Sequence, residues 1–536
     1  NRQDNRQGLP KVIQKLTKMN SELHNPGQKG RVVLVSAGPG DPGLITAAGL
    51  EYLAAADVVV YDALSSPKLL AHVQLDAELI YVGKRGGNHA KTQDQINDIL
   101  VEKAKSGKLV IRLKGGDAYL FGRGAEELAY LSKHGVDAIA LPGVTAGVAA
   151  PMMAGIPVTH RKIASTVTLV TGHEDPTKDE TAVDYQSLAG LIAKGGTVCF
   201  YMGVGRLGLI CDVLQSHGLG ADTPAALVQW GTTPQQRHIV TNLGNAVRDV
   251  EQAGISSPAI ILVGQVAAIS EPGLDFFTKR PLFGQTILIT RTRQQASAFG
   301  AQLGYLGADV IEAPTIDIVP PDDWADVDAV IKDVKNYDWL ILTSRNGVTA
   351  MRDRMAKMNL DARHLAGVKI AAIGSATAES LEDELKIIPD LVPTKFVAES
   401  LAAELIAKHD VAGKKMLLLR ADIARPALPE LLAEAGAEIT EHVIYQTKLA
   451  DGIPEEALLA LREKRVDWVT FTSSSTARNM VDLLGSEKDL LKDCKLASIG
   501  PITSKTMTDL GLPIDVEASQ SDIPGLVSAL VAAVKK

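Results

Sequence analysis

The chain has 536 residues, of which 46% are hydrophobic and 22% charged, and it carries a formal net charge of −8. Its length predicts three or four lobes at one domain per ~150 residues, and a net negative charge with only 4% aromatic residues excludes a general attraction to nucleic acid. No apolar run approaches the ~20 residues of a membrane span, so no membrane partner is expected.

The N-terminal region and the cysteines point to no secretion signal and no metal site. Residues 1–30 are polar, lack the apolar segment and cleavage site of a signal peptide, and are expected to form a flexible extension of a cytoplasmic protein. The three cysteines, Cys199, Cys211 and Cys494, lie in no metal-type spacing. We therefore expect inert thiols rather than a disulfide or a bound metal.

Strand and helix patterns alternate from Arg31 onward. Strand-like runs lie at 32–36, 57–61, 78–82, 108–113 and 137–142, and helical stretches lie near 46–55, 92–105 and 123–134. This alternation is typical of an α/β lobe with a parallel sheet.

A second set of strand-like runs is spaced differently. The runs lie at 166–172, 197–203, 223–231, 236–243 and 257–264. Several are separated by only a few residues, as hairpins require, so a mixed or antiparallel sheet is predicted. Residues 270–283 lack periodicity, and we interpret them as a linker between domains.

The chain repeats itself from Gly284 onward. Residues 337–353 resemble 466–482, residues 369–385 resemble 495–511, and the segments that begin at 287 and 416 also resemble one another. The repeat distance far exceeds the ~20 to 50 residues of a solenoid unit. Two similar α/β lobes are therefore predicted, and a cleft between such lobes is the default binding site.

A glycine-rich loop follows the first strand, at Gly38-Pro-Gly40-Asp-Pro-Gly43. It satisfies the dinucleotide pattern G-x-G-x-x-G, and Asp62 ends the next strand about 20 residues on. However, Asp41 would place a negative charge beside a pyrophosphate, and Pro42 removes an N–H donor. A ligand without phosphates fits better, and a purely structural turn is the simplest alternative.

A second glycine loop follows the strand at 108–113. It reads Lys114-Gly115-Gly116-Asp117, so a glycine pair and an acid lie at another strand end. Paired glycine loops let backbone approach a flat ligand, and Asp117 could accept hydrogen bonds from an ammonium group or a ribose. S-adenosylmethionine, which is cationic and free of phosphate, suits this chemistry, whereas a solvated turn acid is the alternative for Asp117.

These loops belong to a longer series of motifs that resembles the uroporphyrinogen-III C-methyltransferase family, from about 31 to 268. The motifs are VSAGPGDPGLIT at 35–46, YDAL at 61–64, VGKRGGNH at 82–89, RLKGGDAYLFGRGAEE at 112–127, PGVTAG at 142–147, GIPVTHR at 155–161 and FYMGV at 200–204. Many motifs in the family order make the resemblance highly specific.

The resemblance implies a binding site for S-adenosylmethionine and two catalytic residues. The implied cofactor-binding residues are Pro39, Gly115, Gly116, Asp117, Leu120, Thr145, Ala146, Met202 and Gly231. It also implies that Asp62 is the proton acceptor and Lys84 the proton donor. Outside these motifs, Asp62 would be a helix cap and Lys84 a surface lysine. The family usually has Pro-Phe where this chain has Ala118-Tyr119, so a freer loop backbone is expected.

A uroporphyrinogen carries many carboxylates, so its binding site needs cations. Positive side chains cluster near the motifs, and any one of them alone would be an ordinary solvated charge. The expected substrate-binding set is Lys84, Arg85, Arg112, Lys114, Arg123, Arg161 and Lys162.

The second half resembles the uroporphyrinogen-III synthase family, with less specific motifs. These are the segment at 289–314, LTSRNGV at 342–348, FTSSST at 471–476, AAIGSATA at 371–378, ASIGPITSKT at 497–506 and VIYQT at 443–447. That family has two α/β lobes and a two-stranded connector. The resemblance implies one lobe from 284–314 and 450–536, another from 322–441, and connectors at TIDIV (315–319) and VIYQT.

In the synthase family, hydroxymethylbilane loses water and closes with inversion of its last ring, without an organic cofactor. Binding and folding of the substrate, with one proton donor near the leaving hydroxyl, can suffice. The resemblance implies Tyr445 as this donor and Ser344, Ser473 and Thr503 as polar contacts. An aromatic side chain packed between the lobes is the alternative for Tyr445.

Together these observations predict a bifunctional enzyme: a methyltransferase domain at 31–269 and a synthase domain at 284–536. The second half would make uroporphyrinogen III, and the first would methylate it twice to precorrin-2, for siroheme or cobalamin. A homodimer through the methyltransferase domain is one arrangement considered. Only ~30 residues precede the first strand, so no dehydrogenase-chelatase module is expected there. The rival hypothesis is a nicotinamide-dependent dehydrogenase followed by a non-catalytic ligand-binding module.

Overall fold

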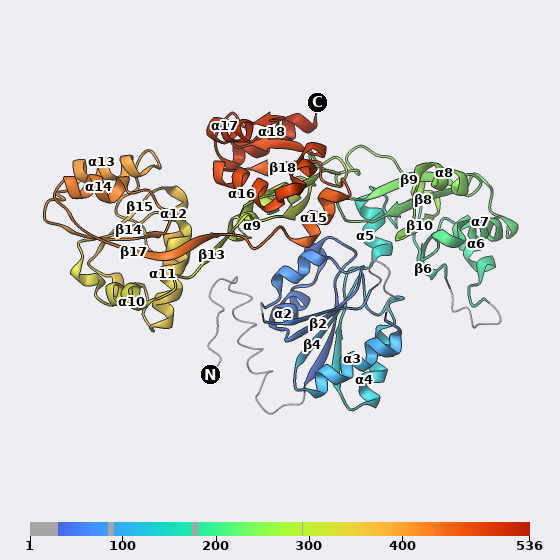
Figure 1. Cartoon of the computed structure of the whole chain (residues 1–536). Helices are drawn as coiled ribbons and strands as arrows, with labels where there is room; N and C mark the ends of the chain where they lie inside the picture. The colour runs from blue at the N-terminus through green and yellow to red at the C-terminus, as the bar shows by residue number, and fades with distance from the viewer. Residues whose placement is uncertain (1–29, 75, 84–90, 174–180, 292, 536) are drawn as a thin grey trace. The chain divides into compact units, whose positions relative to one another are not determined.

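The computed structural model describes residues 30–74, 76–83, 91–173, 181–291 and 293–535 (Figure 1). The chain divides into two compact units. The first contains the residues up to Gln285 together with Leu303–Asp309, and the second contains Thr286–Gln302 and Val310–Lys536. Within the described residues, no helix is both long and apolar enough to cross a membrane.

The first sheet has five parallel strands in the order β3-β2-β4-β1-β5. Their bounds are β1 Arg31–Ser36, β2 Val58–Tyr61, β3 Glu78–Tyr81, β4 Leu109–Lys114 and β5 Asp137–Leu141. The central strands are mostly apolar, because helices bury both faces of a parallel sheet, although β4 also carries Arg112 and Lys114. Since the strands are parallel, the loops that follow them meet at one edge of the sheet.

Two groups of helices cover this sheet. Helices α3 (Gln93–Lys105) and α4 (Gly124–Lys133) pack on one face, and α2 (Ala47–Ala55) packs on the other. Helix α3 begins at a capping box, in which Thr92 and Gln95 bond reciprocally to each other's backbone N–H. Glu127 on α4 lies beside the carboxyl end of β4, because it pairs with Lys114.

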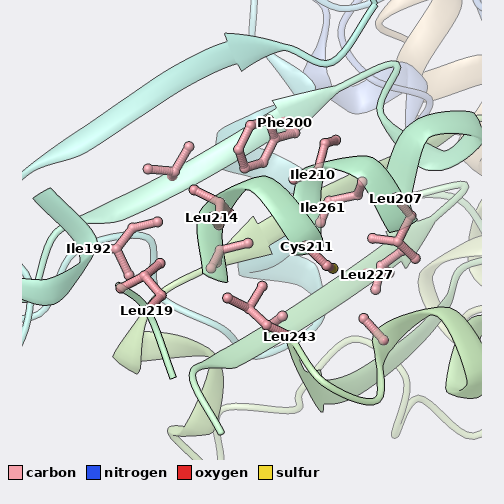
Figure 2. Packing of buried hydrophobic residues seen from close by; sticks show 14 of the residues in the cluster. Ile192, Phe200, Leu207, Ile210, Cys211, Leu214, Leu219, Leu227, Leu243 and Ile261 are labelled. Carbon is pink, nitrogen blue, oxygen red and sulfur yellow. The ribbon is translucent and has the colours of Figure 1, made fainter. Parts of the chain in front are cut away.

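The second sheet is mixed, as predicted, in the order β6-β7-β10-β8-β9. Strands β6 and β7 are parallel, and the other pairs are antiparallel. The bounds are β6 Val167–Thr171, β7 Thr197–Tyr201, β8 Pro224–Gln229, β9 Arg237–Asn242 and β10 Ala259–Val263. Helices α6 (Tyr185–Ala193), α7 (Leu207–Ser216) and α8 (Ala246–Ala253) bury one face (Figure 2). Helix α5 (Ala146–Met153) packs on the other.

The strands from β11 onward, most of whose residues belong to the second unit, form two five-stranded sheets, in the orders β12-β11-β18-β19-β20 and β13-β17-β16-β14-β15. The strands are β11 Thr286–Ile289, β12 Asp309–Glu312, β13 Ile316–Val319, β14 Trp339–Leu342, β15 Lys369–Ala372, β16 Lys415–Ala421, β17 Glu438–Leu449, β18 Trp468–Phe471, β19 Lys495–Ser498 and β20 Val516–Glu517. The helices are α9 Arg293–Tyr305, α10 Ala325–Lys332, α11 Arg345–Lys357, α12 Ser375–Leu385, α13 Ala398–Lys408, α14 Ala427–Glu434, α15 Glu455–Arg462, α16 Ser474–Leu484, α17 Pro501–Asp509 and α18 Ile523–Val534.

The internal repeat corresponds to matching strand–helix units. The pair β14–α11 corresponds to β18–α16, and β15–α12 corresponds to β19–α17. Strand β17 has twelve residues and serves two roles. Its first part pairs in parallel with β16, and its last part pairs antiparallel with β13, from Val319↔Gln446 to Ile316↔Leu449. Together β13 and β17 form a two-stranded connector, as the fold class predicted.

Candidate active site

The two glycine loops of the first sheet are joined directly by backbone hydrogen bonds. The N–H of Gly116 donates to the carbonyl of Gly38 over 2.7 Å, and the N–H of Gly38 donates to the carbonyl of Gly116 over 3.2 Å. Both glycines have positive φ, +76° and +68°, which side chains disfavour. The loop after β1, which contains Pro39, therefore lies beside the loop after β4, which contains Gly115 and Asp117.

The loop after β1 is poorly suited to a phosphate. The N–H of Gly43 donates to the carboxylate of Asp41, the N–H of Asp41 to the Thr232 hydroxyl, and the N–H of Gly38 to Gly116. A phosphate cradle needs several such N–H groups directed at the ligand. This geometry disfavours a dinucleotide and fits a phosphate-free ligand such as S-adenosylmethionine.

Asp117 braces its own loop. One carboxylate oxygen accepts from the N–H groups of Tyr119 and Leu120, at 2.8 and 3.1 Å, and the other accepts from the N–H of Gly143 at 2.9 Å. Since a carboxylate offers about four acceptor positions, most of its capacity serves the protein. Asp117 thus fixes the peptide groups of Leu120 and Gly143 more than it faces a ligand.

The departure from the family at Ala118 has a structural counterpart. The N–H of Ala118 donates to the Ser36 hydroxyl at 3.0 Å, and that hydroxyl donates to the carbonyl of Leu141 at 2.7 Å. A proline at 118 could not make the first bond. In this chain the hydroxyl of Ser36 therefore ties the loop at Ala118 to β1 and β5, and the freer backbone stays a prediction.

Tyr201, at the end of β7, holds the start of α5. Its hydroxyl lies 2.5 Å from the Thr145 hydroxyl and accepts from the N–H of Gly147 at 2.6 Å. Burial raises the pKa of Tyr201, so the hydroxyl stays protonated. The start of α5, with Thr145 and Ala146, is thereby tied to the residue that precedes Met202.

Unusual backbone conformations gather in these loops. Eight described residues other than glycine have positive φ. Five of the eight lie in the loops that follow β4, β7 and β8: Phe121, Arg123, Met202, Trp230 and Thr232. Such conformations are costly and concentrate at functional sites. Gly231, another expected cofactor residue, lies among them, and a Cβ there would be 2.2 Å from the Cβ of Ala150.

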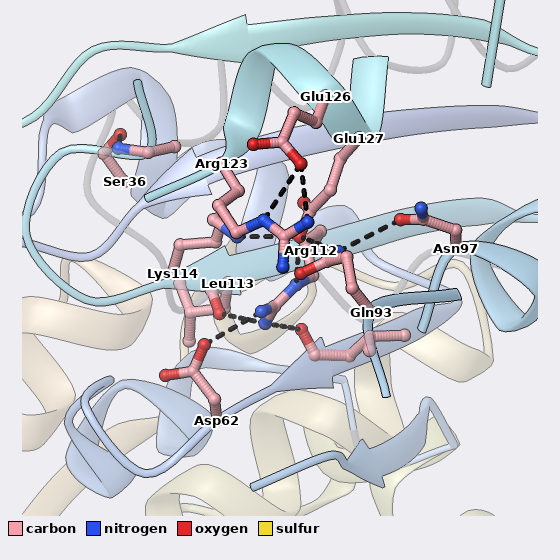
Figure 3. Close-up of polar contacts among 12 residues, drawn as sticks. Ser36, Asp62, Gln93, Asn97, Arg112, Leu113, Lys114, Arg123, Glu126 and Glu127 are labelled. Atoms are coloured by element: carbon pink, nitrogen blue, oxygen red, sulfur yellow. Dashed lines mark hydrogen bonds and ion pairs between the residues drawn. The ribbon is translucent and has the colours of Figure 1, made fainter. Parts of the chain in front are cut away.

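Asp62 lies just beyond β2 and pairs with Arg112. The Nη2 atom of Arg112 donates to Oδ2 of Asp62 at 2.9 Å (Figure 3). The Arg112 side chain is 4% exposed and that of Asp62 is 26% exposed. Arg112 therefore presents a fixed positive charge to a carboxylate that still reaches solvent, which keeps this carboxylate oriented.

Glu127 on α4 extends the Asp62–Arg112 pair into a network of charged side chains that also includes Lys114. The Glu127 side chain is fully buried, and its Oε1 accepts from Lys114 at 2.7 Å and from Gln93 at 3.0 Å. The Nε atom of Arg112 lies 3.6 Å from the same oxygen. Burial, and then the nearby Arg112, lower the pKa of Lys114. Sequence reasoning missed Glu127, although it closes the quoted RGAEE motif.

The expected substrate cations divide into three groups. Arg112 and Lys114 are 3% and 6% exposed and paired, so their burial argues against direct contact with the substrate. Arg123, Arg161 and Lys162 are exposed, and Arg123 pairs with Glu126. Lys84, the expected proton donor, and Arg85 lie outside the described residues.

In the second unit, Tyr445 and Ser344 meet. The Tyr445 hydroxyl lies 2.9 Å from that of Ser344, which also caps α11 by accepting from the N–H of Gly347. Tyr445 is 8% exposed, and burial raises its pKa above the ordinary value of 10.0. Its hydroxyl is therefore protonated at neutral pH and can donate a proton, although its ring also packs in the lobe core.

Ser473 and Thr503 lie in the other lobe of that unit. Ser473 caps α16, and Thr503 lies in the first turn of α17 and is 4% exposed. Ser474 donates to the carbonyl of Ile502 at 3.2 Å, so the starts of these two helices are adjacent. Two hydroxyl-rich helix ends therefore meet at the carboxyl edge of this sheet.

Comparisons with known proteins match both halves of the chain. Residues 31–247 match the family of tetrapyrrole (corrin/porphyrin) methylases, and residues 297–528 match uroporphyrinogen-III synthase HemD. A porphyrin biosynthesis protein HemD of Ruminiclostridium josui is 36% identical over 94% of this chain and 98% of its own length. The chain belongs to the family of fused tetrapyrrole methylases and uroporphyrinogen-III synthases.

Other similar proteins match the methylase half of this chain. A uroporphyrinogen-III C-methyltransferase of Methanocaldococcus jannaschii is 48% identical over 45% of this chain and 98% of its own. A solved uroporphyrin-III C-methyl transferase of Thermus thermophilus, complexed with S-adenyl homocysteine, is 33% identical over 45% of this chain and 94% of its own, with a TM-score of 0.38. The two predicted activities are confirmed, and the dehydrogenase alternative finds no support.

Proposed function

We propose that this chain converts hydroxymethylbilane to uroporphyrinogen III and then transfers two methyl groups to it, giving precorrin-2. The methyl donor is S-adenosylmethionine. The observation that carries this proposal is the pair of hydrogen-bonded glycine loops at the edge of a parallel sheet. The N–H groups of the loop after β1 already donate within the protein, which favours a ligand without phosphate. A cytoplasmic location and the choice between siroheme and cobalamin remain predictions.

The proposed cofactor site combines residues from both lobes of the first unit. Pro39, Gly115, Gly116, Asp117 and Leu120 come from the first sheet, and Met202 and Gly231 come from the second. Thr145 and Ala146, at the start of α5, complete the set. When bound, S-adenosylmethionine supplies a methyl group on a sulfonium centre. The protein contributes alignment, because methyl transfer to carbon is an in-line displacement.

Asp62 is the proposed proton acceptor. After methylation of a pyrrole carbon, a proton must leave to restore conjugation, and a carboxylate side chain that reaches solvent can take it. Arg112 holds this carboxylate in place. Lys84 remains the proposed proton donor. Arg85, Arg123, Arg161 and Lys162 are the proposed carboxylate ligands, with Arg112 and Lys114 in a supporting role.

In the synthase half, Tyr445 is the proposed proton donor to the departing hydroxyl. Its buried, protonated hydroxyl and its contact with Ser344 support this role. Ser344, Ser473 and Thr503 are the proposed polar contacts for the substrate. A homodimer through the methyltransferase domain remains part of the proposal.

One experiment tests both activities. The purified protein is incubated with hydroxymethylbilane, with and without S-adenosylmethionine, and the products are identified by mass and isomer. We expect uroporphyrinogen III without the methyl donor and dimethylated product with it. Formation of the spontaneous I isomer alone would contradict the synthase activity. Binding of NADH in place of S-adenosylmethionine would contradict the methyltransferase activity.

A further inference from the structure

A chain of hydrogen bonds joins the two lobes of the first unit beside the proposed cofactor site. The N–H of Asp41, in the loop after β1, donates to the Thr232 hydroxyl at 3.0 Å. The N–H of Thr232 donates to Oε1 of Gln236 at 2.8 Å, and Nε2 of Gln236 donates to the carbonyl of Met153 at 2.9 Å. The chain of bonds thus runs from the first lobe through the loop after β8 to the end of α5.

The residues in this chain of bonds are buried and closely packed. Thr232 and Gln236 are 1% and 3% exposed. A Cβ on Gly40 would lie 2.5 Å from the Thr233 methyl group and 3.2 Å from the Thr232 hydroxyl. The first glycine loop therefore fits against this second-lobe loop without room for a side chain, and the polar groups between them are shielded from competing water.

The backbone of Thr232 is held in a conformation that its side chain disfavours. Its φ is +71°, which is unusual for a β-branched residue. Glycine would relieve this strain but could not supply the hydroxyl that reaches Asp41. Strain that persists beside a ligand site, and that places a specific polar group, is a sign of a functional constraint.

We propose that Thr232 and Gln236 are positioning residues that hold the two walls of the cofactor pocket in the binding arrangement. We call the hydrogen bonds from Asp41 through Thr232 and Gln236 to Met153 the latch. Asp41 lies two residues from Pro39, and Thr232 directly follows Gly231, so the latch joins segments with expected cofactor residues in both lobes. This proposal rests on the proposed binding of S-adenosylmethionine. Neither residue needs to touch the cofactor, because fixing one lobe against the other raises the fraction of molecules that can bind it.

Valine and serine substitutions isolate the hydroxyl of Thr232. Thr232→Val keeps the shape and the branched Cβ but removes the bond to Asp41, whereas Thr232→Ser keeps that bond. Thr233→Val is the matched control, because the hydroxyl of Thr233 donates only within its own loop, to the carbonyl of Trp230. S-adenosylhomocysteine affinity is measured by titration calorimetry on the full chain, and thermal unfolding is measured without ligand.

We expect Thr232→Val to weaken S-adenosylhomocysteine binding about fivefold, the effect of one lost hydrogen bond on the binding-competent fraction. Thr232→Ser and Thr233→Val should bind within about twofold of the wild type. Equal affinity of the two valine variants, or failure of serine to restore binding, would overturn the latch while the cofactor assignment stands. Absence of binding to the wild type would instead overturn the proposed cofactor, and the latch with it.

Discussion

Gly38 and Gly116 exchange two backbone hydrogen bonds, although 77 residues lie between them in the chain. Both glycines have a positive φ, a conformation that residues with side chains disfavour. It makes one continuous wall of two loops that follow neighbouring parallel strands, β1 and β4.

Gly116→Ala should therefore weaken cofactor binding. A Cβ at Gly116 meets no atom within 4 Å, so the cost is the disfavoured positive φ, about 1 kcal/mol. Gly107→Ala is the matched control, because Gly107 also has positive φ and open space but lies in the turn before β4. Both variants should lose similar stability in thermal unfolding. Only Gly116→Ala should bind S-adenosylhomocysteine more weakly. Equal affinity of the two variants would contradict a role of the Gly38–Gly116 hydrogen bonds in cofactor binding.

Asp62→Asn should separate proton transfer from cofactor binding. Asparagine can still accept from Arg112 but cannot take a proton at neutral pH. We expect methylation to slow by about 10²- to 10⁴-fold, the usual contribution of a positioned base. Affinity for S-adenosylhomocysteine, measured by calorimetry, should change little. A large loss of affinity would assign Asp62 to the cofactor pocket instead.

Glu127→Gln should destabilise the first unit strongly. It removes the carboxylate that Lys114 and Arg112 share, and leaves buried cations without a full partner. Breaking such a buried pair costs about 3 to 5 kcal/mol. Glu126→Gln, one residue earlier on α4, removes an exposed ion pair with Arg123 and should cost about 1 kcal/mol or less. Thermal unfolding of the two variants compares them, and similar melting temperatures would contradict the network.

Tyr445→Phe should impair the synthase activity alone. The variant keeps the buried ring and loses the hydroxyl that contacts Ser344. Formation of uroporphyrinogen III should slow by about 10²-fold if the hydroxyl donates the proton. Tyr337→Phe is the control, because Tyr337 lies in the same lobe before β14, whereas Ser344 lies after it. Unchanged isomer ratio and rate in Tyr445→Phe would favour a packing role.

The three cysteines should be unreactive in the folded protein. Burial raises the pKa of Cys199 to about 12 and that of Cys211 and Cys494 to about 11, from an ordinary value of 9.0. Iodoacetamide at pH 8 should modify these thiols only after denaturation, as mass spectrometry can determine. Rapid labelling of the native protein would contradict their burial.

The same pKa shifts predict a loss of stability in alkali. Above pH 9 the unfolded chain releases thiol protons that the folded protein retains, so the free energy of unfolding falls as pH rises toward 11 or 12. Denaturant unfolding between pH 8 and 10.5 measures this slope. Cys199→Ala should make the slope shallower, because it removes one of the three titrating thiols.

Local patterns predicted most of the fold. The apolar runs at 32–36 and 197–203 became β1 and β7, because short buried runs bounded by glycine leave few alternatives. The two glycine loops were also visible, since parallel strands place their carboxyl ends together. These features depend on residues that are close in sequence.

The partners of the polar side chains could not be predicted in the same way. Asp41 meets Thr232 across 191 positions of sequence, and Asp117 meets Gly143 across 26. The position of Arg112 in its motif does not tell whether its charge faces a substrate or a buried glutamate. Only the packed structure shows that it is buried, because burial depends on which helix covers the strand.

Strand β17 shows how the second unit is assembled. The chain enters one lobe along β13, which ends at Val319, and returns to the other lobe along the last part of β17, from Gln446. These two strands pair with each other, so the two crossings lie side by side. One lobe is thus inserted within the chain of its twin. The chain passes between the two lobes at two adjacent strands, β13 and β17, so the sheet of β11, β12, β18, β19 and β20 is built from residues on both sides of the inserted lobe.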